Sequence, residues 1–284
     1  MYSDKAIVIG RSIAKIQVKH TRFSEALDGA ARVIQLGNTI PEPFGMTLLG
    51  AAGAGKSFLV ECLQQNPMGW PFLRPNAVLC ASLKEEPTVA QIQADLLAQF
   101  NYLISPRATR QTNKSQFDLL TAAVRERGIQ LVALDEYQHV FLSSKRDVRA
   151  AVVDWTKRFM TATSLPVLLS GTEMLRSIEK ADPQLSTRVS AVYHLPEFQN
   201  DTDWIGVLTA IASSSSEIDL SLISKKHTSL FRATGGVFRS LKGLLMEAAM
   251  VAVDAGAVSV TMEHLALAYQ RYVGNSSTRS SPFA

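Results

Sequence analysis

The chain has 284 residues, enough for one large domain or two modest ones, and its 46% hydrophobic residues supply material for a core. No apolar run approaches the roughly 18 residues that a membrane-spanning helix needs, and a net charge of +4 permits contact with nucleic acid without demanding it. The first eleven residues lack the long apolar stretch of a secretory signal, and Cys62 and Cys80 form no ligand-like pair, so we expect a cytoplasmic protein with buried thiols and no membrane partner.

The first predicted elements are an arm and a helix. Residues 1–20 mix apolar and basic side chains without clear periodicity, which indicates an arm that packs partly on the body of the protein or on a partner. Residues 22–36 then place apolar side chains at helical spacing, and Gly37 with Asn38 ends this predicted helix.

A glycine-rich stretch follows the short apolar run at residues 46–49 and leads into another helical pattern. It fits the phosphate-loop pattern, in which two glycines bracket four residues and precede Lys-Ser. A strand, a loop and a helix in this order direct backbone N–H groups and the helix N-terminus toward an anion. An ordinary glycine-rich turn is the alternative, but the match and its context predict that the protein binds ATP. The residues expected to hold it are Gly50, Ala51, Ala52, Gly53, Ala54, Gly55, Lys56, Ser57 and Phe58.

Two of these residues have specific predicted roles. Lys56 is expected to reach the β- and γ-phosphates, and the Ser57 hydroxyl is expected to ligate Mg²⁺.

A second chemical signal lies about 80 residues after Lys56, where the apolar residues 129–134 end in Asp135 and Glu136. Open α/β sheets carry their sites at the carboxyl ends of the strands. We therefore predict that Asp135 holds Mg²⁺ and that Glu136 polarises the attacking water, with a strand end that carries solvated acids as the alternative. The elements predicted between the two motifs are a strand at 77–81, a helix capped by Thr88, a polar loop at 101–113 and a helix at 115–127.

A helix at residues 145–161 and a strand at residues 165–172 come next, and the strand ends in hydroxyl side chains. In ATPases such a strand lies between the two motif strands and offers a polar residue to the γ-phosphate and water. Ser170 or Thr172 is the candidate, and a plain strand terminus is the alternative. Strands alternate with helices up to residues 191–195, which predicts an α/β fold with a parallel sheet covered on both faces.

From about residue 200 the predicted elements are helical. Arg239 begins the longest of these helices, where it either faces the nucleotide or is a solvated first-turn arginine. The predicted organisation is an N-terminal arm at 1–20, an α/β domain at 21–199, a helical lid domain at 200–272 and a disordered tail at 273–284.

Together these features resemble an AAA+ ATPase, and more narrowly the TniB/TnsC family of transposition ATPases. The similarity covers roughly residues 20–272 and is carried most by residues 19–23, 168–173 and 234–239. It implies that Thr172 or Ser170 is a sensor of the bound nucleotide and that Arg239 is the sensor of the lid. It also implies that Arg188, after a short helix, faces the ATP site of a neighbouring subunit. The chain departs from the family at residues 185–189, which hold one arginine instead of an arginine-rich run.

The resemblance implies an ATP-hydrolysing homo-oligomer, a ring or a helical filament on double-stranded DNA. Such a protein links a transposase to target DNA and receives target information from a TniQ-type adaptor. A second class stays open, an AAA+ ATPase that remodels or loads protein partners without direct DNA binding. A small-molecule kinase is disfavoured by the helical C-terminal region. Basic residues on two predicted helices are candidates for DNA contact, with ordinary solvated helix faces as the alternative: Lys114, Arg125, Arg127, Lys145, Arg146 and Arg149.

Overall fold

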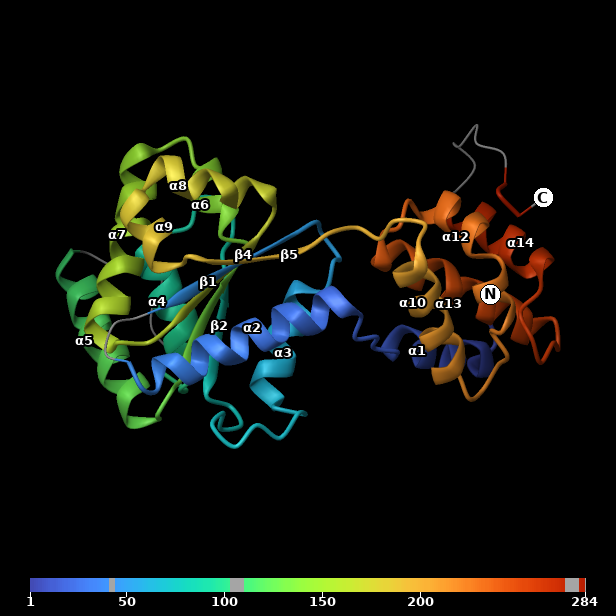
Figure 1. Ribbon diagram of the computed structural model, residues 1–284, viewed down its shortest axis with the longest axis horizontal. Helices are drawn as coiled ribbons and strands as arrows, with labels where there is room; N and C mark the ends of the chain where they lie inside the picture. Colours follow the sequence, from blue (N-terminus) through green and yellow to red (C-terminus); the bar gives the residue numbers. More distant parts are fainter. Residues whose placement is uncertain (41–43, 103–109, 274–280, 284) are drawn as a thin grey trace. The chain divides into compact units, whose positions relative to one another are not determined.

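The computed structural model describes residues 1–40, 44–102, 110–273 and 281–283, and Figure 1 shows its helices and strands. The chain divides into two compact units, which are described separately. Unit 1 contains Met1–Thr21 and Glu197–Ala284, and unit 2 contains Arg22–Pro196.

Unit 2 is built on a five-stranded sheet in the order β2-β3-β4-β1-β5, and every neighbouring pair of strands is parallel. The strands are β1 (Gly45–Gly50), β2 (Val78–Ser82), β3 (Leu131–Asp135), β4 (Val167–Gly171) and β5 (Ala191–Leu195). The hydroxyl-ended strand β4 lies between β1 and β3, as predicted from the sequence. The predicted parallel α/β sheet is therefore confirmed.

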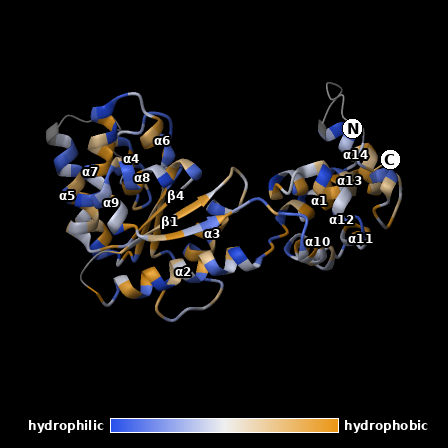
Figure 2. Cartoon of the chain, turned by 45° about the horizontal axis from the view of Figure 1, so that its top comes forward, coloured by the Kyte–Doolittle hydropathy of each residue, from blue (hydrophilic) through white to orange (hydrophobic). Residues whose placement is uncertain are grey.

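Helices cover both faces of the sheet because successive residues of a strand point to opposite sides. Met46 and Leu48 of β1 pack with Phe23 of α2 and Leu59 of α3 on one side. Leu49 of β1 faces the other side, in a second cluster with side chains of α4, α5 and α7. Figure 2 shows the hydrophobic character of β1 and β4 between these layers. The helices of unit 2 are α2 (Thr21–Gly37), α3 (Lys56–Gln65), α4 (Val89–Ala98), α5 (Arg110–Glu126), α6 (Gln138–Leu142), α7 (Arg146–Thr163), η1 (Glu173–Ser177), α8 (Ile178–Ala181) and α9 (Pro183–Arg188).

Unit 1 is helical and has its own hydrophobic core. Trp204 and Leu230 are fully buried in it, together with side chains of the long helix α13. Its helices are α1 (Asp4–Lys15), α10 (Thr202–Ser214), α11 (Leu222–Lys225), α12 (His227–Thr234), α13 (Phe238–Asp254) and α14 (Met262–Val273).

Residues 1–20, predicted as an arm that packs partly on the body of the protein or on a partner, contain helix α1. Ser3 caps this helix by accepting a hydrogen bond from Ala6 N–H at 3.2 Å. Ile9 and Ile13 are buried in the core of unit 1, where α1 packs against α13. The contact is close at Gly10, where an added Cβ would lie 2.7 Å from the Sδ atom of Met250. The helical spacing of Ile9 and Ile13 was hidden in the sequence by their apolar but exposed neighbours at positions 7 and 8.

One further difference concerns the start of helix α5. Helix α5 begins at Arg110, earlier than the predicted helix at 115–127, and residues 103–109 of the predicted loop lie outside the described residues. Residues 274–280 and 284 of the predicted tail also lie outside them. Phe283 is buried, and its ring centroid lies 6.0 Å from that of Tyr269. Among the described helices, none is long and apolar enough to cross a membrane.

Candidate functional site

The glycine-rich loop joins β1 to α3 at the carboxyl edge of the sheet. Gly53 and Gly55 have φ angles of 85° and 99°, in the left-handed region that side chains disfavour. Gly50 is needed for another reason, because an added Cβ would lie 2.8 Å from the backbone oxygen of Leu195 on β5. Helix α3 starts directly after the loop, and Leu59 N–H donates to the Gly55 oxygen at 2.9 Å. The loop therefore has the backbone that a phosphate cradle requires.

Lys56 is the first residue of α3 and is 5% exposed. Its ammonium donates hydrogen bonds to the backbone oxygens of Gly50 at 2.8 Å and Ala51 at 3.0 Å. These contacts hold the ammonium beside the loop, where it could form an ion pair with a bound phosphate.

Asp135 is the centre of a hydrogen-bonded group at the end of β3. It is 7% exposed and accepts from three donors: Ser57 Oγ at 3.0 Å, Ser170 Oγ at 2.5 Å and Glu136 N at 2.9 Å. Three segments far apart in the sequence thus meet at one carboxylate. Hydroxyl and carboxylate oxygens are ligands that Mg²⁺ prefers.

Glu136 follows Asp135 with a φ of 56°, a left-handed backbone conformation that is uncommon for residues other than glycine. Its carboxylate accepts a hydrogen bond from Gln138 Nε2. The Oε1 atom of the same Gln138 accepts from Thr172 N at 3.2 Å, so this amide connects Glu136 to the end of β4. Sequence reasoning missed Gln138, because no motif singles out an amide two residues after the acid.

The two candidate hydroxyls at the end of β4 differ in their contacts. Ser170 is fully buried and donates to Asp135, whereas the buried Thr172 Oγ1 has no hydrogen-bond partner among the described residues. The Ser170 hydroxyl is therefore committed to Asp135, whereas the Thr172 hydroxyl is available to another partner. The assignment of either as a sensor stays a prediction.

Arg188 is not brought to the other predicted residues. It ends α9, before the first residue of β5, whereas the glycine-rich loop follows the last residue of the parallel neighbour β1. The two therefore lie at opposite edges of the sheet. The Arg188 guanidinium donates to the Lys157 backbone oxygen at 2.9 Å and to Thr161 Oγ1 at 2.7 Å. Asp182, considered as its local partner, instead pairs with Lys157 at 2.8 Å.

Arg239 lies in the first turn of α13 and belongs to unit 1. Its predicted role toward the nucleotide stays a prediction.

Cys80 of β2 is one of the titratable groups close to Asp135 whose pKa is raised by burial, and Tyr137 is another. Burial raises the pKa of the Cys80 thiol to about 11, and the negative charge of Asp135 acts in the same direction. The thiol is therefore protonated at neutral pH. Neither Cys62 nor Cys80 forms a disulfide within the described part of the chain.

Asp182 should stabilise the helix that carries Arg188. Its carboxylate accepts from Leu185 N at 2.7 Å as the N-cap of α9 and pairs with Lys157. Burial favours its protonated form, but the hydrogen bonds from Lys157 and the backbone of Leu185 outweigh burial and lower the pKa of Asp182. We expect Asp182→Ala to lower the free energy of unfolding by about 1–2 kcal/mol in urea at pH 7, as for other lost caps.

The matched control is Asp154→Ala, since Asp154 contacts the same Lys157 at 3.0 Å but is 73% exposed. It should cost at most a few tenths of a kcal/mol. Because the pKa of Asp182 is lowered on folding, its contribution is present above the unfolded pKa of about 3.9 and is lost as the pH falls further. Equal stabilities of the two variants at pH 7 would contradict this role.

The geometry at the carboxyl edge fits ATP and Mg²⁺. Gly53 and Gly55 give the loop the backbone conformation of a phosphate cradle, and Lys56 supplies a cation. Ser57 and Asp135 supply adjacent oxygen ligands, with Glu136 next to them.

Comparisons with known proteins agree with this geometry. The TniB family, described as Bacterial TniB protein, matches residues 14–200. Among curated proteins, no match to the sequence is found. Solved structures also resemble the chain, and three of them, each at 15–17% identity, illustrate the likeness. The Aeropyrum pernix ORC2 protein in its ADPNP–ADP complexes has a TM-score of 0.67 at 17% identity, with 91% of this chain and 69% of that chain covered.

The other two structures match the chain with similar TM-scores and identities. Drosophila ORC bound to DNA has a TM-score of 0.63 at 15% identity, with 96% of this chain and 67% of that chain covered. Cdc6p from Pyrobaculum aerophilum has a TM-score of 0.61 at 15% identity, with 88% and 66% covered. At these identities the likeness concerns the fold alone, and the fold is the AAA+ fold of the ORC and Cdc6 proteins.

Proposed function

This chain belongs to the bacterial TniB family, and from that premise we propose that it is an ATP-hydrolysing regulator of DNA transposition. The observation that carries the proposal is the junction at Asp135, which joins Ser57 of the glycine-rich loop, Ser170 of β4 and the backbone of Glu136. Such a junction is what an enzyme of the AAA+ class needs to couple phosphate binding with a water-activating acid.

ATP is proposed to bind with its phosphates in the loop between Gly50 and Ser57. The ammonium of Lys56 lies 2.8–3.0 Å from two loop oxygens, and a short movement of this flexible side chain would bring it to the β- and γ-phosphates. Ser57 and Asp135 would hold Mg²⁺, which would neutralise negative charge on the phosphates.

Glu136 is the proposed base for the attacking water. In the structure its carboxylate is held by Gln138, whose other amide atom is bonded to the backbone of Thr172. Gln138 is therefore a proposed positioning residue between the acid and β4. The hydroxyl of Thr172, which has no partner among the described residues, is available to a phosphate oxygen or to the water.

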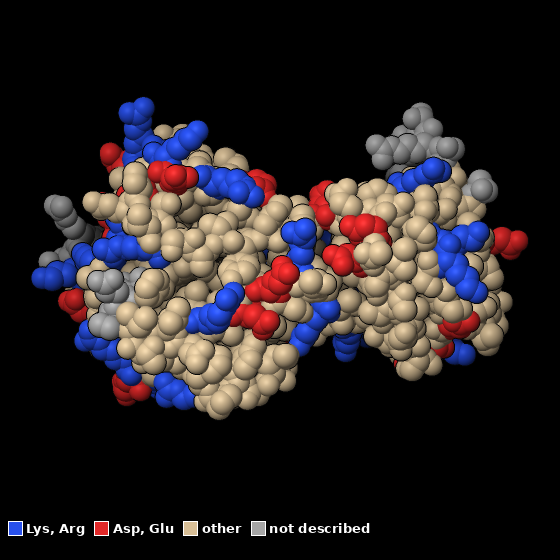
Figure 3. All heavy atoms as spheres, in the orientation of Figure 1, with Lys and Arg blue, Asp and Glu red and all other residues tan. Residues whose placement is uncertain are grey.

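The proposed partners are double-stranded DNA, a transposase, a TniQ-type adaptor and further copies of this chain. One structural neighbour, Drosophila ORC, was solved bound to DNA, and the family match supports a role in transposition. Figure 3 shows Lys and Arg side chains scattered along the end of unit 2 that holds α5 and α7. Two of the six candidates have local partners, since Arg125 donates to the Ala162 oxygen and Lys145 pairs with Glu86. Lys114, Arg127, Arg146 and Arg149 remain as proposed contacts for the DNA backbone.

DNA binding should depend steeply on salt. If several Lys and Arg side chains neutralise phosphates, the logarithm of the affinity falls linearly with the logarithm of salt concentration, by about 0.9 per phosphate contacted. We expect roughly 10²–10⁴-fold weaker binding at 200 mM than at 50 mM salt, for four or more contacts. Fluorescence anisotropy with a labelled duplex of random sequence, with ATP, with ADP and without nucleotide, measures this.

A double variant, Arg146→Gln with Arg149→Gln, should reduce the salt slope by about 1–2, whereas Arg11→Gln in unit 1 serves as the control. An affinity that does not change with salt would exclude binding through phosphates. No binding with any nucleotide would favour the alternative, an AAA+ ATPase that remodels or loads protein partners.

A further inference from the structure

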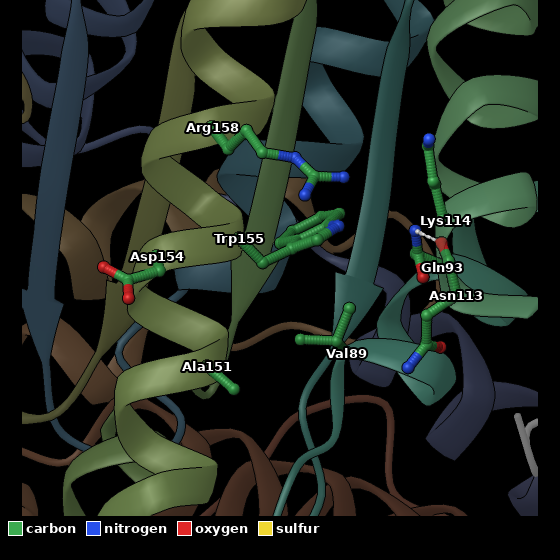
Figure 4. Close-up of a pocket in the computed structure, with 8 residues that line it drawn as sticks. All are labelled: Val89, Gln93, Asn113, Lys114, Ala151, Asp154, Trp155 and Arg158. Carbon is green, nitrogen blue, oxygen red and sulfur yellow. Dashed lines mark hydrogen bonds between the residues drawn. The ribbon is translucent and has the colours of Figure 1, made fainter. Parts of the chain in front are cut away.

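A pocket of about 650 Å³ lies between α4, α5 and α7, within the size range of sites for small ligands. None of its lining residues belongs to the glycine-rich loop or to the Asp135 group, so a role for this pocket does not depend on the proposed ATP site, although Lys114 is also a proposed DNA contact. Figure 4 shows Trp155 and Arg158 extending from α7 toward Gln93 of α4 and Asn113 of α5.

The floor of the pocket carries polar atoms that lack a partner. Trp155 is 6% exposed and its indole N–H has no acceptor among the described residues. Gln93 is 0% exposed, and its Nε2 donates to the Asn113 backbone oxygen at 3.2 Å while its Oε1 has no donor in the same part of the chain. The side-chain oxygen of Asn113 is unpartnered in the same way. Buried polar atoms are nearly always hydrogen-bonded in folded proteins, so a donor and two acceptors left over in one pocket point to a ligand.

These atoms specify the chemistry of the ligand. The Trp155 N–H needs an acceptor, and the Gln93 oxygen on the facing helix needs a donor. A peptide unit carries a C=O and an N–H that point in opposite directions, so an extended segment lying between α4 and α7 satisfies both at once. A free carboxylate offers acceptors only and leaves the Gln93 oxygen unpaired.

The rim of the pocket adds positive charge. Lys114 and Arg158 line it, and within the described part of the chain neither takes part in an ion pair. The Arg158 guanidinium lies over the Phe117 ring at 3.9 Å from its centroid, which fixes its position. Asp154, the acid of the lining, points away from Trp155 in Figure 4 and pairs with Lys157 at 3.0 Å. The rim therefore favours a ligand with a negative charge.

We propose that this pocket binds a short, extended, acidic peptide segment of a partner protein. One peptide unit of the segment bridges Trp155 and Gln93, and an acidic side chain next to it pairs with Lys114 and Arg158.

The indole N–H of Trp155 reports on binding directly. In a ¹⁵N-labelled full-length chain the three tryptophans give three indole signals, and Trp155→Phe identifies the one of interest. Trp204 is the internal control, because its indole N–H already donates to the His227 oxygen at 2.9 Å in unit 1. The probes are pools of terminally blocked pentapeptides with Asp or Glu fixed at the centre, and matched pools with Lys at the centre.

Acidic pools at millimolar concentration should move the Trp155 signal downfield, while lysine pools and the Trp204 signal should show no change. Gln93→Leu removes the acceptor and should weaken binding about tenfold. The exposed pair Lys114→Gln with Arg158→Gln should weaken it roughly three- to tenfold, and Arg149→Gln, on the same helix but outside the pocket, should leave it unchanged.

Three results would overturn the proposal. If no acidic pool moves the Trp155 signal, the pocket takes no peptide and its polar atoms are satisfied by solvent. If sodium acetate produces the same shift, the pocket is a site for a small anion. If a 20-base-pair duplex produces it while the peptide pools do not, the pocket belongs to the DNA surface.

Discussion

Glu136→Gln will bind ATP as the parent chain does and hydrolyse it about 10²–10⁴ times more slowly. The amide keeps the size of the side chain, and it can still contact Gln138, so the loop and the Asp135 group should be undisturbed. It cannot accept the proton of the attacking water. Steady-state phosphate release measures turnover, and equilibrium binding of a fluorescent ATP analogue measures affinity.

Two variants make this result specific. Lys56→Ala removes the cation bonded to Gly50 and Ala51 and should lose nucleotide binding itself. Glu126→Gln changes an acid at the end of α5 and should turn over normally. If purified Glu136→Gln hydrolysed ATP at the parent rate, Glu136 would not be the base, and another group would have to be sought at the carboxyl edge of the sheet.

Arg188→Ala will bind ATP but hydrolyse it up to about 10³–10⁵ times more slowly, if the residue supplies the cation that stabilises the transferring phosphoryl group. The structure separates Arg188 from the site of its own chain, because α9 ends at the amino edge of the sheet and the glycine-rich loop lies at the carboxyl edge. The proposed role therefore requires the ATP site of a neighbouring subunit. In that assembly the Arg188 guanidinium either breaks its hydrogen bonds to Lys157 and Thr161 or keeps them while it contacts the phosphate. Head-to-tail repetition of such a contact gives a ring or a helical filament.

A mixing experiment tests this role. Arg188→Ala protein has an intact loop, and Lys56→Ala protein has a broken loop but keeps Arg188, so the mixture should recover part of the activity that each lacks alone. Arg176→Ala is the control, because Arg176 is an arginine of η1 that pairs with Glu173 at the surface. Both variants must be folded and must co-assemble, as shown by circular dichroism and light scattering. No recovery under those conditions would remove Arg188 from the role.

The sequence predicted the parts of the fold that depend on local chemistry. The glycine pattern around Lys56 and the apolar runs before Asp135 and Thr172 require particular backbone conformations and burial, and the sheet order and the AAA+ fold agree with them. The roles of individual site residues and the domain boundaries stay predictions.

What the sequence did not predict depends on contacts between distant segments. Helix α1 is held by α13, and its own apolar pattern is blurred by exposed Ile7 and Val8. Gln138 acquires its place only because β4 lies beside β3, which brings Thr172 N within 3.2 Å. The pocket at Trp155 exists because three helices pack with an opening between them. The spacing of apolar residues along a single helix does not indicate such an opening.

The left-handed backbone conformation at Glu136 lowers folding stability at a residue that is proposed to be needed for ATP hydrolysis. A side chain other than glycine or asparagine at such a φ costs of the order of 1 kcal/mol, and the chain carries that cost at the position proposed to activate water. A descendant released from the need to hydrolyse ATP would gain stability by replacing this residue, so Asn or Gly should accumulate here early as the activity decays. Glu136→Asn should accordingly melt no lower than the parent chain while losing turnover, a combination that substitution of Asp135, which is buried and accepts three hydrogen bonds, would not give.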